Sequence, residues 1–172
     1  CAPRSKRSWP TRPDLLAGSM ARVARLLIVH HTPSPAMAEL LDAAVQGARD
    51  PEITGVETVR RAALSAGPAD VLAADAILLG TPANIGYMSG ALKHFFDVVY
   101  YPIADDTRGL PYGLYVHGNL DTAGAITAVE TIAGGLGWQR VAAPVQVLGT
   151  PDAAARAACA ELAATLAATV MT

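Results

Sequence analysis

The sequence is poor in cysteine and in aromatic residues. Its 172 residues include two cysteines, Cys1 and Cys159, whose spacing matches no metal site or redox motif. A chain without a disulfide framework is typical of a reducing compartment, so we expect a cytoplasmic protein. Aromatic residues make up only 5% of the chain, which argues against a stacking platform for single-stranded nucleic acid.

An excess of charge of one sign is also missing. The chain has 13 lysines and arginines against 15 aspartates and glutamates, which gives a net charge of −2 at pH 7. Attraction to nucleic acid or to an anionic membrane depends on a basic surface or segment. We therefore expect neither nucleic acid nor a membrane as a partner.

Long apolar runs are absent too. No run approaches the roughly 20 residues that a membrane-spanning helix needs. The basic, proline-containing start, residues 1–19, lacks the apolar stretch of a secretion signal, and we expect it to be a disordered or non-native arm. Residues 20–172 are then expected to form one domain, and with 52% hydrophobic residues in the chain it can bury a substantial core.

From residue 22 onward, short apolar runs alternate with helical patterns. The continuous apolar run at 26–29 is typical of a strand that is covered on both faces. Periodicity predicts further strands at 53–59, 76–80, 111–117 and 141–148, and helices at 35–48, 89–101, 122–136 and 152–169. Between residues 59 and 75 we expect a short helix or none.

This alternation predicts an α/β fold with a five-stranded parallel sheet between two layers of helices. Five strands in about 150 residues favour the smaller doubly wound strand order, 2-1-3-4-5. Sheets of this kind bind ligands beyond the carboxyl ends of the strands, where the strand order reverses. The candidate site is therefore formed by the loops after residues 29, 79 and 116.

The first loop, residues 30–37, leaves a buried strand and enters a helix, so the helix dipole and free amides favour a phosphate there. Pro33 and Pro35 offer no N–H group. The remaining donors are two hydroxyls, of Thr32 and Ser34, and three amides, of Ser34, Ala36 and Met37.

No metal site is predicted in this loop. His30 and His31 are adjacent strand residues, so their side chains point to opposite faces and do not easily share one ion. No side chain of the sequence forms a convincing nucleophile–base arrangement either, so no catalytic residue is predicted.

The second loop, residues 80–90, contains three glycines and a proline, which is typical of a shaped turn. Ala83, Asn84 and Ile85 are expected at the sheet edge, where a planar ring could lie against the backbone. The Asn84 side chain could form a hydrogen bond with the polar edge of such a ring.

The second loop also carries a resemblance. Residues Gly80-Thr81-Pro82, Gly86, Gly90, Leu92-Lys93 and Asp97 match the pattern G-[ST]-P-x-x-x-G-x-x-x-G-x-[LM]-[KR]-x-x-x-D. This segment resembles the flavodoxin-like superfamily, and its spacing is similar to that of NADPH-dependent FMN reductases and tryptophan-repressor-binding-protein-type quinone oxidoreductases. The resemblance implies a flavodoxin-like fold from about residue 22 to residue 171, with flavin mononucleotide (FMN) as cofactor.

The resemblance also implies roles for individual residues. The segment that lines the flavin ring in those families corresponds to Pro82, Ala83, Asn84, Ile85 and Gly86. The first loop resembles their phosphate loop, with Thr32 and Ser34 at the hydroxyl positions, whereas proline stands at 35 where glycine is usual and methionine at 37 where a hydroxyl is usual.

The third loop, residues 117–124, passes the pyrimidine side of the flavin in the resembling families. Backbone amides around Gly118 and Asn119 are expected to meet that ring edge, with Gly124 in the same loop. His117 has two interpretations: a donor to the flavin or to a quinone oxygen, or a histidine at the end of a strand that is bonded to backbone.

Three functions remain open at this point. The leading hypothesis is an FMN-dependent oxidoreductase that passes electrons from NAD(P)H to a quinone or a similar small acceptor. The alternatives are a flavodoxin-type electron carrier and a flavodoxin-like domain that has lost its flavin and acts as a binding module. A homodimer or homotetramer is compatible with the apolar cluster at residues 100–103.

Overall fold

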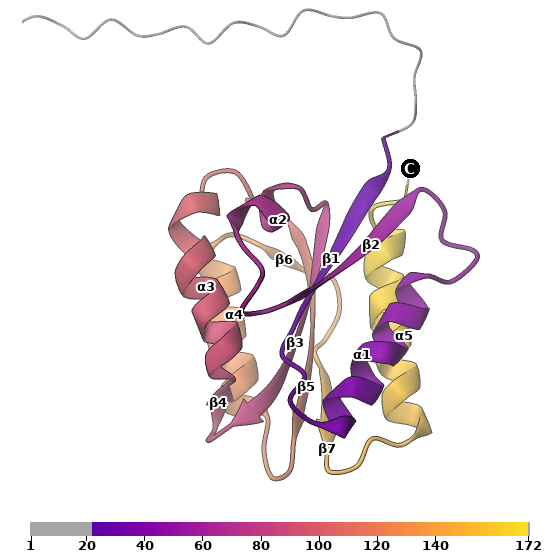
Figure 1. Cartoon of the computed structure of the whole chain (residues 1–172), viewed down its shortest axis with the longest axis vertical. Coiled ribbons are helices and arrows are strands. Elements are labelled where there is room, and N and C mark those ends of the chain that lie inside the picture. Colours follow the sequence, from indigo (N-terminus) through magenta and orange to yellow (C-terminus); the bar gives the residue numbers. More distant parts are fainter. Residues whose placement is uncertain (1–21, 172) are drawn as a thin grey trace, which may run out of the picture.

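The computed structural model describes residues 22–171, so the arm expected over residues 1–19 lies outside the described residues. A parallel sheet stands between two layers of helices, with α1 and α5 on one face and α3 and α4 on the other (Figure 1). The elements follow in the order β1 (Ala24–His30), α1 (Pro35–Ala48), β2 (Val56–Ala62), α2 (Pro68–Leu72), β3 (Ala76–Asn84), β4 (Tyr87–Met88), α3 (Gly90–Ile103), β5 (Pro111–Gly118), α4 (Ala123–Gly135), β6 (Gln139–Arg140), β7 (Val145–Leu148) and α5 (Ala153–Ala168).

The strand order is β2-β1-β3-β5, followed by β6 and β7, which both pair with β5. This is the predicted order 2-1-3-4-5, with the fifth position shared by two short strands. The short helix expected between residues 59 and 75 is the five-residue α2. The α/β fold class and the doubly wound order are therefore confirmed.

The second strand begins three residues later than the sequence predicts. The expected strand covered 53–59, whereas β2 covers Val56–Ala62 and follows Gly55, whose φ of 73° turns the chain. Ile53 supplied the apolar signal, but it packs on the core from the preceding turn rather than from a strand. The expected start was therefore wrong, because a core contact was taken for strand periodicity.

The expected strand over 141–148 was also wrong in its continuity. Between the pairs Tyr112–Arg140 and Tyr115–Val145, β5 advances three positions while the last strand advances five. The two additional residues interrupt the ladder, and Pro144 lacks an amide hydrogen there. The sequence offers an apolar run at this place, while the register divides it into β6 and β7.

Each face of the sheet has its own hydrophobic core. Leu27, Val29, Phe95 and Phe96 belong to the cluster beneath α3 and α4. The opposite cluster lies beneath α1 and α5, which approach so closely that a Cβ on Gly47 would lie 2.0 Å from the Ala160 carbonyl oxygen. Because β1 and β3 are covered on both faces, their near-continuous apolar sequence is what a buried parallel strand requires.

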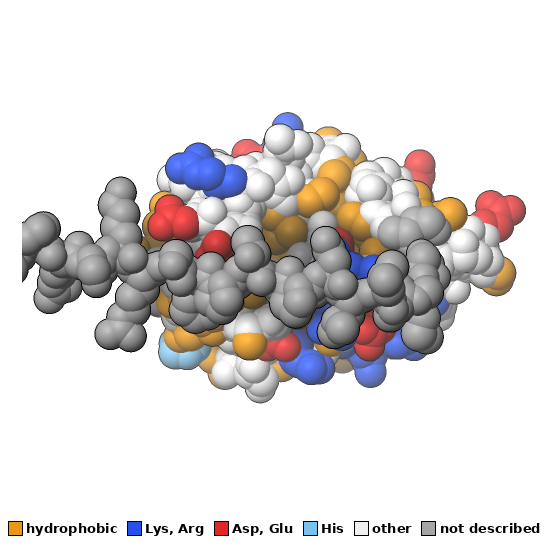
Figure 2. Space-filling model, turned by 90° about the horizontal axis from the view of Figure 1, so that it is seen from above, with side chains coloured by type: hydrophobic (Ala, Val, Ile, Leu, Met, Phe, Trp, Pro, Cys, Tyr) orange, Lys and Arg blue, Asp and Glu red, His pale blue; other side chains and the backbone are white. Residues whose placement is uncertain are grey.

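The carboxyl ends of β1, β3, β5 and β7 lie toward the lower edge of the sheet in Figure 1, where α1 begins. The opposite end, seen in Figure 2, shows basic, acidic and apolar side chains side by side where it is not covered in grey. Among residues 22–171, no helix combines the length and the hydropathy needed to span a membrane.

Tyr115 offers a test of how the sheet is packed. Its ring lies over Gly80, where an added Cβ would come within 2.1 Å of the ring. The Tyr115 hydroxyl is buried and has no hydrogen-bond partner within the described part of the chain. We expect Tyr115→Phe to leave the free energy of unfolding unchanged or to raise it by up to about 1 kcal/mol, because it removes an unsatisfied polar group.

In contrast, Gly80→Ala should lower the free energy of unfolding by about 1–3 kcal/mol, because the ring has no space to move in a packed core. Urea denaturation of both variants measures these changes. A loss of more than about 1 kcal/mol in Tyr115→Phe would contradict the unsatisfied hydroxyl.

Candidate functional site

The three loops expected to form the site are neighbours at one edge of the sheet. His30 at the end of β1 pairs with Gly80 of β3, and Pro82 of β3 pairs with His117 of β5. The strand order reverses between β1 and β3, so the first two loops leave this point in opposite directions. The carboxyl edge therefore presents the arrangement that the sequence predicts.

In the first loop, several expected phosphate donors are engaged within the chain. Ser34 is the N-cap of α1, and its Oγ accepts a hydrogen bond from the Met37 amide at 3.3 Å. The Thr32 Oγ1 lies 2.8 Å from Nδ1 of His30. The amides of Ser34 and Ala36 bond to no other described residue, so they remain free for a ligand.

The prolines of this loop are placed where their missing amide costs little. Pro35 is the first residue of α1, a position whose amide would have no partner within the helix. Pro33 and Pro35 are both exposed, whereas the Met37 side chain is fully buried in the core. The Met37 side chain is therefore not available to a ligand, and its amide already donates to the Ser34 Oγ.

The second loop is a tight hairpin that the sequence does not predict. Strand β4 pairs antiparallel with the end of β3, so Asn84 and Tyr87 face each other across a two-residue turn of Ile85 and Gly86. Both turn residues have positive φ, 51° and 71°, which is typical of a type I′ turn. A β-branched side chain is strained in this region, and Ile85 is also fully exposed.

Two glycines of the third loop allow close backbone packing, and one of them packs against this hairpin. A Cβ on Gly124, in the first turn of α4, would lie 2.0 Å from the Gly86 carbonyl oxygen. A Cβ on Gly118 would lie 2.7 Å from the Asp121 carbonyl oxygen and 3.4 Å from Ala83. The hairpin therefore packs directly against the start of α4, and this contact requires a glycine at position 124.

His117 is bonded to backbone in the third loop. Its Nε2 lies 2.7 Å from the Gly149 carbonyl oxygen, which can only accept, so Nε2 carries a hydrogen and donates. In the neutral ring Nδ1 is then an acceptor. Asn119 and Leu120 follow at the tip of the loop, both exposed.

A cavity of about 410 Å³ joins the first and third loops. A volume of this size is within the range of small-molecule sites. The cavity also includes the loop between β7 and α5, which sequence reasoning missed although Gly149 and the helix cap Asp152 mark a loop at the same edge. The lining residues are Ser34, Pro35, Ala36, Glu39, His117, Asn119, Gly149, Thr150 and Pro151.

Burial and positive neighbours act on His30 at the start of the first loop. Burial is the main cause that lowers the pKa of His30, and the positive charge of Arg60 and the neighbouring His31 lower it further. The Nδ1 atom of His31 is buried without a partner among residues 22–171. Arg60, on β2, is another residue that the sequence analysis missed, because it fell just beyond the expected strand.

Two further expectations concern metal binding and contacts between copies of the chain. Within the range that the structure covers, no three His, Cys, Asp or Glu side chains form a group that could hold a metal ion. In the apolar cluster at 100–103, Ile103 is buried in the core and Tyr101 is exposed. A contact between two copies through Tyr101 stays a prediction.

No protein-family model and no curated protein matches the sequence. A flavodoxin from the domain Archaea is similar to the structure with a TM-score of 0.72 at 16% identity, over 85% of this chain and 98% of that chain. A flavodoxin, WrbA-like protein from Agrobacterium tumefaciens gives 0.71 at 18% identity, over 86% and 97% of the two chains. Rubredoxin oxygen:oxidoreductase from Desulfovibrio gigas gives 0.73 at 13% identity, over 85% of this chain and 36% of that one. The chain therefore has the flavodoxin-like fold that its second loop suggested.

Backbone strain at Ile85 can be tested by mutation. We expect Ile85→Asn to raise the free energy of unfolding by about 1 kcal/mol, because asparagine tolerates a positive φ better than a β-branched residue. Leu120→Asn is the control, since Leu120 is 93% exposed and has no positive φ. Denaturant titrations that give equal changes for both variants would contradict strain at Ile85.

The lowered pKa of His30 can be tested through the pH dependence of stability. Its pKa is lowered in the folded chain, so on acidification the unfolded chain takes up the proton first and stability falls. The loss should begin as the pH drops through about 6.5, the ordinary value for histidine. His30→Gln should show less of this loss in urea denaturation at decreasing pH, whereas the exposed His94→Gln should behave as the wild type. Identical profiles for the wild type and His30→Gln would contradict the lowered pKa.

Proposed function

We propose that the chain binds FMN at the carboxyl edge of its sheet and acts as an oxidoreductase, which passes electrons from NAD(P)H to a quinone or a similar small acceptor. The observation that carries this proposal is the convergence of three loops at the point where the strand order reverses. The similarity to flavodoxins and to a WrbA-like protein supports the same site.

The residues at the edge fit a flavin mononucleotide. The free amides of Ser34 and Ala36, at the start of α1, suit the phosphate group. The backbone from Pro82 to Gly86 and the amides near Gly118 and Asn119 border the place for the ring. The cavity of about 410 Å³ extends from the start of α1 to Asn119, so it lies between the first and third loops.

When bound, FMN supplies the redox chemistry, and the chain supplies anchoring and orientation. The exposed Ile85 and Tyr87 of the hairpin would shield one side of the ring from water. The amides near Gly118 would favour negative charge at the ring edge. His117 is fixed by the Gly149 carbonyl, and in the neutral ring its Nδ1 can accept a hydrogen bond at this edge.

The surface around the site favours a small acceptor over a protein partner. The exposed side chains of the second and third loops include three large apolar ones, those of Ile85, Tyr87 and Leu120. The nearby carboxylates are already bonded: Glu39 pairs with Arg156, and Asp121 accepts the Ala123 amide. An acidic steering patch, which an electron carrier would use, has little to build on here.

Two observations keep the alternatives open to test. The similar structures include flavodoxins, which favours an electron carrier. The internal bonds of Thr32 and Ser34, together with Pro33 and Pro35, favour a domain that has lost its flavin. A titration with FMN separates these possibilities.

We expect FMN to bind with sub-micromolar affinity, with a shifted visible absorption band and quenched fluorescence. Gly124→Ala should weaken binding by roughly tenfold or more, about 1.4 kcal/mol, because the new methyl group displaces the hairpin from α4. Gly134→Ala is the matched control, since it lies on the same helix and an added Cβ there meets nothing within 4 Å.

Absence of binding at tens of micromolar FMN would overturn both flavin hypotheses and leave the binding module. If FMN binds, oxidation of NADPH and NADH with a quinone distinguishes the enzyme from the carrier. Turnover supports the oxidoreductase, whereas a bound flavin that neither nucleotide reduces supports the carrier.

A further inference from the structure

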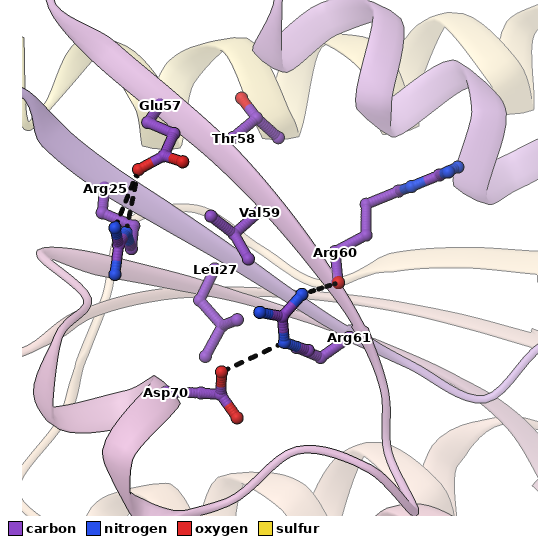
Figure 3. Close-up of a pocket in the computed structure, with 8 residues that line it drawn as sticks. All are labelled: Arg25, Leu27, Glu57, Thr58, Val59, Arg60, Arg61 and Asp70. Atoms are coloured by element: carbon purple, nitrogen blue, oxygen red, sulfur yellow. Dashed lines mark hydrogen bonds and ion pairs between the residues drawn. The ribbon is translucent and has the colours of Figure 1, made fainter.

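Arg60 faces the opposite side of the sheet from its neighbour Arg61. In the parallel register Arg60 lies opposite Ile28, which belongs to the core beneath α1 and α5. Figure 3 shows Arg61 on the side of Asp70 and Leu27, while Arg60 extends from the other side of the strand. Arg60 therefore shares a face with His30, and His30 lies two residues further toward the carboxyl edge of the sheet.

Among the described residues, 22–171, Arg60 also has no acidic partner. Arg22, Arg25, Arg61, Arg140 and Arg156 each form an ion pair. Within the range 22–171, Arg49, Arg60 and Arg108 form none. Arg49 follows α1 and Arg108 precedes β5, so both lie at the amino ends of the strands. Arg60 is the one of these three that lies toward the proposed site.

The charges that act on His30, on the same face as Arg60, are basic rather than acidic. Both charges that act on His30, those of Arg60 and His31, lower its pKa. The Thr32 hydroxyl lies 2.8 Å from His30 Nδ1, and the free amides of Ser34 and Ala36 follow in the same loop. Such a group of donors and positive charge attracts an anion, because each of these groups gains from a negative neighbour.

We propose that Arg60 binds the phosphate group of the nucleotide at the first loop and thereby makes the site select FMN over riboflavin. This inference rests on the proposed function. Pro33 and Pro35 remove two amides from the loop, whereas a guanidinium offers five N–H donors in a planar fork that fits phosphate oxygens. Arg60 thus supplies, from a neighbouring strand, the donors that the loop lacks.

The test compares FMN with riboflavin, which lacks the phosphate, in the wild type, Arg60→Gln and Arg61→Gln. We expect Arg60→Gln to weaken FMN binding about tenfold and to leave riboflavin binding within about twofold. Arg61→Gln is the control, with the same strand and the same lost charge on the opposite face, and should leave both affinities within about twofold. Salt should weaken FMN binding more in the wild type than in Arg60→Gln.

A second measurement does not depend on the flavin. The pKa of His30, followed by NMR in the free protein, should rise in Arg60→Gln, which shows that the guanidinium acts at the first loop. An unchanged ratio of FMN to riboflavin affinity in Arg60→Gln overturns the inference and leaves the proposed function standing. A wild type that binds neither flavin overturns both.

Discussion

Strand β3 is paired on both sides only as far as Gly80. The rest of the site depends on the fact that β1 ends there while β3 continues. Up to Gly80 it lies between β1 and β5. Thr81 and Pro82 then pair with β5 alone, and the last two residues of β3 pair with β4. Pro82 falls in the singly paired stretch, where its missing amide removes no bond to β1. The first loop can then turn away into α1, while β3 continues into the hairpin.

Two buried hydroxyls fix the base of that hairpin. The Thr81 Oγ1 accepts the Ser89 amide at 3.0 Å, and the Ser89 Oγ accepts the Leu92 amide at the start of α3. The tip rests on Gly124 at the start of α4. A loop that is tied at its base and supported at its tip can hold one strained residue in place, since neighbouring contacts outweigh the local cost.

The central strands and the long helices could be predicted from the sequence because their apolar residues report burial directly. The hairpin could not, because β4 has two residues and Ile-Gly is not a usual pair for a type I′ turn. Arg60 was missed for a related reason: the strand was placed three residues too early, and its face follows only from the correct register. The internal hydrogen bonds of the first loop could not be predicted either, because they depend on side-chain rotamers that a sequence does not specify.

The contact between Gly47 and the Ala160 carbonyl has a mechanical consequence. With no side chain between them, α1 and α5 cannot slide along each other without a backbone clash, and the ion pair of Glu39 with Arg156 joins them again near the site. The two helices are therefore expected to move as one rigid body on this face of the sheet. A displacement of the first loop would move the start of α1 and, with it, the loop between β7 and α5, so both walls of the cavity would shift together.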